Sequence, residues 1–122
     1  MTGKEYVSLA MRTNDGESSQ RLRDKLCFED DLGDLINGIF GLMGETGEFA
    51  DMIKKWIFHE HELDREHLRK EMGDIMWYVA MVCYSMGFNL DNIMEMNIDK
   101  LRARYPDGFD VQRSQHRKVG DL

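Results

Sequence analysis

Apolar side chains recur at steps of three and four residues through the middle of the chain, the spacing that gathers them on one face of an α-helix. The first stripe, over residues 29 to 58, comprises Leu32, Leu35, Ile36, Ile39, Leu42, Met43, Phe49, Ala50, Ile53 and Ile57. The second, over residues 65 to 86, comprises Leu68, Met72, Ile75, Met76, Val79, Val82, Cys83 and Met86. The pattern predicts two long helices joined by a short polar interval.

Residues that favour helix ends flank these stripes. Asp64 is placed to cap the second helix and Gly87 to end it. Asn89 is placed to cap a further helix over 90–105, which Pro106-Asp107-Gly108 would end. We therefore expect a third helix directly after the long pair.

The two ends of the chain are less regular. Residues 4–12 predict a short helix, and the charged segment 17–31 is either a packed connection or a frayed helix. Residues 111–122 have no period and are predicted to form a mobile basic tail. No segment alternates well enough to predict a strand. With its short connections the chain is predicted to be one all-α domain over residues 1–122, an antiparallel bundle of about four to five helices.

Four glycines recur at every third residue of the first long stripe, at Gly38, Gly41, Gly44 and Gly47. Each weakens a helix by about 1 kcal/mol relative to alanine. Close approach of a neighbouring helix would explain why glycine is kept there, and a bend is the alternative.

Charge and cysteine content exclude some classes of protein. The formal net charge of −7 argues against stable binding to nucleic acid, although the last stretch of the chain is basic. Cys27 and Cys83 have no metal-ligand spacing, which favours a reducing, cytoplasmic location over a disulfide framework. No apolar run reaches the roughly 18 residues of a membrane span, so no membrane partner is expected.

Two pairs of carboxylates lie in the two long predicted helices, Glu45 with Glu48 and Glu71 with Asp74. Residues three apart share a helix face, and both pairs lie at the margin of an apolar stripe. Antiparallel packing would bring the two acidic edges together, and carboxylates suit Mg²⁺, with Mn²⁺ as a substitute. The alternative is a solvated acidic face.

The third predicted helix places Asn97, Lys100 and Arg104 on one edge, which suits the phosphates of a polyphosphate. The two basic residues could instead favour the helix dipole. Lys55 is a further candidate phosphate contact. Trp56 and Tyr78 are candidates to stack on a base or sugar, although aromatic residues at stripe edges also serve as core or interface.

The polar interval between the long helices is rich in histidine and glutamate. His59, His61 and His67 alternate with acidic residues there, but without the fixed spacing of a transition-metal site.

Three segments together resemble the MazG-like, all-α nucleoside triphosphate pyrophosphohydrolases: GLMGETGEFADMIKKW, KEMGDIMWYVAM and NIDKLRARYPDGF. The signature of that family is Glu-x-x-Glu, a spacer of variable length and Glu-x-x-Asp. The resemblance covers roughly residues 35 to 109, and EYVSLAMRT is similar to the family's opening helix.

The resemblance implies an enzyme that cleaves (deoxy)nucleoside triphosphates between the α- and β-phosphates. It implies Mg²⁺ on Glu45, Glu48, Glu71 and Asp74, with Glu45 or Glu48 as the base that takes a proton from water. It also implies phosphate contacts from the basic edge of the third helix, and assembly as a homodimer or homotetramer.

Two other classes compete with this interpretation. A helical interaction or regulatory module could keep the fold without turnover. A di-iron or di-manganese bundle would use Glu-x-x-His, whereas this chain has Asp74 at the histidine position.

Overall fold

The structure is a computed structural model that describes residues 1–28 and 31–121. Its helices are α1 (Gly3–Ala10), the 3₁₀ turn η1 (Met11–Thr13), α2 (Ser18–Phe28), α3 (Leu32–Phe58), α4 (Arg65–Met86), α5 (Leu90–Arg104) and α6 (Val111–Gln115). The prediction of an all-α fold is confirmed. Glu29 and Asp30, with which the first long helix was expected to begin, and Leu122 lie outside the described residues.

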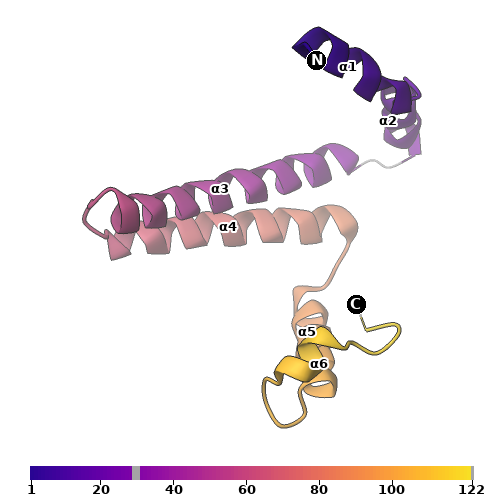
Figure 1. The fold of residues 1–122 in the computed structure, drawn as a ribbon. Helices are drawn as coiled ribbons and strands as arrows, with labels where there is room; N and C mark the ends of the chain where they lie inside the picture. Colours follow the sequence, from indigo (N-terminus) through magenta and orange to yellow (C-terminus); the bar gives the residue numbers. More distant parts are fainter. Residues whose placement is uncertain (29–30, 122) are drawn as a thin grey trace.

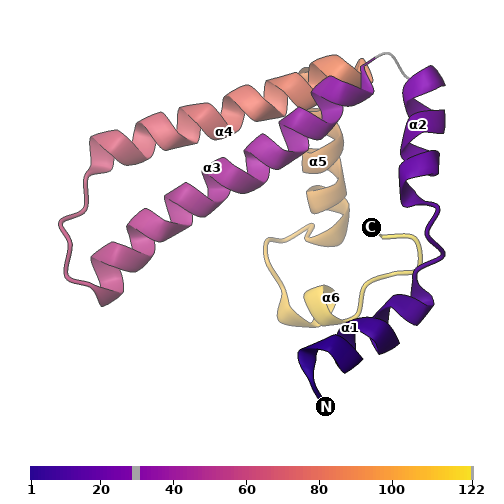
Figure 2. The ribbon, with the colours of Figure 1, turned by 90° about the horizontal axis from the view of Figure 1, so that it is seen from above.

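The centre of the molecule is the antiparallel pair formed by α3 and α4 (Figures 1 and 2). The ends of α4 are those predicted. The side chain of Asp64 accepts hydrogen bonds from the backbone N–H groups of Glu66 and His67, at 3.1 and 2.9 Å. Gly87 ends the helix with φ at +65°, a conformation in which glycine is favoured. The helices outside this pair do not close around it.

The glycines of α3 divide into two kinds. A Cβ on Gly38 would lie 2.8 Å from Val82 Cγ2, and one on Gly41 would overlap the ring of Tyr78. A Cβ on Gly44 or Gly47 would meet nothing within 4 Å. Close packing against α4 therefore explains the first two glycines and leaves the other two beside open space.

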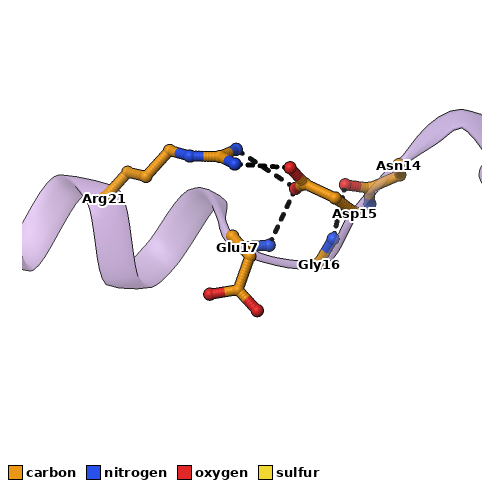
Figure 3. A network of polar contacts seen from close by, with 5 residues as sticks. All are labelled: Asn14, Asp15, Gly16, Glu17 and Arg21. Carbon is orange, nitrogen blue, oxygen red and sulfur yellow. Dashed lines mark hydrogen bonds and ion pairs between the residues drawn. The ribbon is translucent and has the colours of Figure 1, made fainter.

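Of the charged segment 17–31, Ser18–Phe28 form the regular helix α2, so this part is a helix and not an irregular connection. Figure 3 shows how the turn before it is held. Asp15 accepts hydrogen bonds from the guanidinium of Arg21, at 3.1 and 2.5 Å, and from the N–H of Glu17, at 3.0 Å. Arg21 lowers the pKa of Asp15 most, followed by the Glu17 N–H. Because both side chains are exposed, this ion pair contributes little to stability.

Helix α5 leaves the hairpin at Gly87 and projects away from it (Figure 1). As predicted, Asn89 caps its start, accepting from the N–H of Asn92 at 3.2 Å. The segment after it, in which the sequence has no period, contains the short helix α6, and Asp110 caps that helix by accepting from the N–H of Arg113 at 2.8 Å. The mobility of this segment stays a prediction.

A single chain buries little. Among the described residues, those classed as buried are Gly38, Glu71 and Cys83. The accessible surface is 10463 Å², whereas a compact monomer of 14.3 kDa would expose about 6,800 Å². Large apolar side chains such as Phe40, Tyr84 and Phe109 are well over half exposed. None of the described helices is long and apolar enough to cross a membrane.

Candidate active site

Three of the four predicted carboxylates meet between α3 and α4. Oxygen atoms of Glu45 on α3 and of Glu71 and Asp74 on α4 all lie within 4.8 Å of one another. Glu71 is buried, with 9% of its surface exposed, and Asp74 is open to solvent. An oxygen-only group of this kind, which we call the carboxylate cluster, has the donor chemistry that suits Mg²⁺ or Mn²⁺.

The electrostatics of the carboxylate cluster favour a bound cation. The pKa of Glu45 is raised, first by desolvation and then by repulsion from Glu48, Asp74 and Glu71. Like charges placed this close resist simultaneous ionisation, and a divalent cation relieves that resistance.

Glu48 does not join the carboxylate cluster. It is exposed and lines a neighbouring solvent-open groove of about 390 Å³ that also contains Glu71. Lys55, the predicted phosphate contact, lines the same groove and bonds Asp51 at 2.6 Å. Gly44 and Gly47 form part of the wall, so the two glycines without a packing partner leave this space open.

His67 is a neighbour of the carboxylate cluster to which the sequence assigned no role. Its Nε2 lies 2.8 Å from Oε1 of Glu71, one helical turn further along α4. A nitrogen in this position holds the carboxylate in one orientation, as outer partners of metal ligands do. The signal was the spacing of four residues, which puts both side chains on one face of α4.

The aromatic neighbours differ in part from those expected. Tyr78 lines a groove with Glu45 and Asp74, and its role in contacting a base or sugar stays a prediction. The other aromatic residue of that groove is Trp77, whose ring meets the Tyr78 ring edge-on at 5.0 Å. Trp56, the residue singled out from the sequence, is not part of the groove wall.

The predicted basic edge lies apart from the carboxylates in a single chain. Lys100 and Arg104 line a pocket with residues from 113 to 121, and this pocket has no lining residue in common with either groove on the hairpin. Asn97 is exposed on α5. One chain therefore presents two separate halves, an acidic one on α3 and α4 and a basic one beyond α5.

Replacing Glu45 by Gln is expected to stabilise the metal-free protein increasingly as pH rises. Glu45 keeps its proton to higher pH in the folded chain than in the unfolded chain, because its pKa is raised above the ordinary 4.5. The unfolded state therefore binds fewer protons, and folding stability falls between these two pKa values. Thermal unfolding of Glu45→Gln and of the native chain, from about pH 4 to about pH 8, measures the difference in stability between the two proteins.

The matched control is Glu95→Gln, which removes the same charge from an exposed position on α5. The native chain should also gain more thermal stability from Mg²⁺ than Glu45→Gln does, since the cation offsets the repulsion that the variant has already lost. A stability gap that does not change with pH would contradict the assignment.

Comparison with known proteins agrees with the geometry. The family model of the MazG nucleotide pyrophosphohydrolase domain matches residues 36–109, which include all four predicted carboxylates and the basic edge of α5. A curated relative, the Gene 37 protein of Mycobacterium phage L5, is 34% identical over 79 residues, covering 58% of this chain and 69% of the relative. No solved structure matches. The chain therefore belongs to the MazG nucleotide pyrophosphohydrolase family.

Proposed function

We propose that this chain is a Mg²⁺-dependent enzyme that hydrolyses (deoxy)nucleoside triphosphates between the α- and β-phosphates, in the cytoplasm, giving a monophosphate and pyrophosphate. The observation that carries the proposal is the convergence of Glu45, Glu71 and Asp74 across two helices of a MazG-family domain. Oxygen atoms of three carboxylates within 4.8 Å of one another repel when ionised, and a bound cation would offset that repulsion.

The carboxylate cluster would hold the cation, with Mn²⁺ as a possible substitute for Mg²⁺. When bound, the metal supplies positive charge against the triphosphate and the leaving pyrophosphate. His67 would keep the Glu71 carboxylate oriented.

Glu48 is our candidate for the catalytic base. Its carboxylate is outside the carboxylate cluster and borders an open groove, so it can accept a proton from a water there. The water oxygen attacks the α-phosphorus, the bond to the bridging oxygen breaks, and pyrophosphate leaves with the electron pair. Lys55, on the same groove, would bind a phosphate oxygen.

The activity is tested by measuring pyrophosphate release from a panel of ribo- and deoxyribonucleoside triphosphates with Mg²⁺, with Mn²⁺ and with a chelator. We expect release from at least one nucleotide and none with the chelator. No release from any nucleotide under either metal would favour the alternative, a non-catalytic helical interaction module.

A second copy of the chain is the partner we propose. The exposed surface exceeds that of a compact monomer by several thousand Å², and obligate homodimers bury about 2,000–5,000 Å². Phe40 and Met43 on α3, each 67% exposed, belong to the apolar surface that would be covered. We also propose that assembly brings Asn97, Lys100 and Arg104 of one copy to the carboxylate cluster of another, since none of the three lines either groove on the α3–α4 pair of its own chain.

Light scattering on the purified protein is expected to give two or four times the chain mass of 14.3 kDa. Changing both Phe40 and Met43 to Glu should lower that mass, because two charges would be buried in an apolar contact. Gln112→Glu, outside the α3–α4 pair, is the control for added charge. A native protein that runs as a monomer at micromolar concentration would contradict the proposal.

A further inference from the structure

A basic pocket of about 180 Å³ lies between α5 and the segment that follows it. Lys100 and Arg104 line it from α5, and Arg113, Arg117 and Lys118 line it from the later segment. Against these five cationic side chains, Asp121 is the one acidic residue of the described lining. Such a pocket selects anions that carry several charges.

Asp121 forms a bidentate contact with one edge of the Arg104 guanidinium. Nε of Arg104 donates to Oδ2 at 2.7 Å and Nη2 donates to Oδ1 at 2.5 Å. The two side chains are only 10% and 19% exposed, so the contact lies inside the pocket wall. The pKa of Asp121 is lowered, mainly by Arg104 and further by the charges of Arg117 and Lys100.

A carboxylate that accepts two parallel hydrogen bonds from one edge of an arginine has the geometry in which arginine also binds phosphate. The side chain of Asp121 therefore fills one of the positions that a phosphate group would take. Among the described lining residues, one carboxylate stands against five cationic side chains. A polyphosphate carries several negative charges and so complements such a lining better than a single carboxylate does.

We propose that this pocket binds a polyphosphate group and that Asp121 is an internal competitor, which must release Arg104 before the polyphosphate binds. The choice of a polyphosphate over other multivalent anions rests on the proposed function. Arg117, from the segment after α5, then becomes a phosphate contact in addition to the predicted basic edge.

The competition between Asp121 and a polyphosphate is tested by measuring the binding of inorganic triphosphate to the intact protein by calorimetry. A chelator in the buffer keeps metal off the carboxylate cluster, so that the cluster takes no part. Asp121→Asn removes the competing charge and keeps the size of the side chain, so the affinity should rise about tenfold. Asp107→Asn removes the same charge from an exposed turn outside the pocket lining. Equal affinities for these two variants would overturn the role of Asp121.

The contribution of the cationic side chains that line the pocket is tested by a second pair of matched variants. Arg117→Gln should weaken triphosphate binding about tenfold. Arg102→Gln removes a charge from α5 at a side chain that is 77% exposed and outside the lining, and it should change little. Similar losses in both variants would show that only overall charge matters, and the pocket assignment would fall.

Hydrogen exchange covers the case in which Asp121→Asn detaches the segment. Triphosphate should then protect the amides of residues 111–121 in the variant, because the ligand takes over the contacts of Asp121. A segment that stays unprotected with triphosphate present would overturn the proposal. Neither binding nor exchange requires turnover. If the protein releases no pyrophosphate but shows these binding and exchange results, the proposed function is wrong and the pocket assignment stands. If it releases pyrophosphate without these results, the pocket assignment is wrong and the proposed function stands.

Discussion

Glu71→Gln is expected to lower kcat/KM for nucleotide hydrolysis at least about a hundredfold and to raise the Mg²⁺ concentration needed for half-maximal activity. Glu71 is the buried member of the carboxylate cluster and also borders the groove of Glu48, so its charge is shared by both parts of the site. The variant keeps the shape of the side chain and an oxygen for His67 to contact, so it should remain folded. Initial rates measured against Mg²⁺ and nucleotide concentration give both quantities.

Glu48→Gln should separate the two roles. As the proposed base it should lower kcat by about 10²–10⁴-fold, while the Mg²⁺ requirement stays near that of the native chain. Glu62→Gln, in the exposed connection between α3 and α4, is the matched control and should leave both quantities unchanged. If Glu48→Gln changed mainly the Mg²⁺ requirement, Glu48 would be a metal ligand, as the family resemblance implies, and the base would have to be sought elsewhere.

Gly41→Ala is expected to destabilise the fold by up to about 2 kcal/mol, although alanine is the better helix former. The helical gain of about 1 kcal/mol is outweighed because the new Cβ would overlap the ring of Tyr78 and overpacking costs about 1–3 kcal/mol. Denaturant unfolding at fixed protein concentration measures the change. Because Tyr78 lines the groove with Glu45 and Asp74, a displaced ring should also reduce activity.

Gly44→Ala, one turn further along α3, is the matched control. A Cβ there meets nothing within 4 Å, so the substitution should stabilise the helix by about 0.5–1 kcal/mol. Equal effects of the two substitutions would show that Tyr78 moves aside without cost and that Gly41 is not kept for close packing.

The helices could be predicted from the sequence because helix formation depends on near neighbours. Apolar residues every three or four positions marked α3 and α4, and Asp64, Gly87 and Asn89 lie at the ends that they were expected to form. The short helix α6 was missed, since five residues are too few to show a period; its cap on Asp110 was the available signal.

The candidate site was predictable in part. Placing both acidic pairs at stripe margins predicted their convergence, which three of the four carboxylates show. Glu48 lines the neighbouring groove instead. Residues three apart on a helix differ by about 60° in direction, so the rotation of α3 decides which of its two carboxylates meets Glu71 and Asp74. The same dependence on helix rotation brings Trp77 rather than Trp56 to the groove.

The sequence by itself determined the helical class, the limits of the central helices, the acidic pairs and the family, since each of these is written in spacings of a few residues. Tertiary structure alone decided which glycines are packed, which carboxylates meet and that Asp121 reaches Arg104 across 17 positions of chain. The reason is physical: spacing along a helix sets which side chains share a face, whereas contacts between helices depend on how the faces are rotated and where the connections lead the chain.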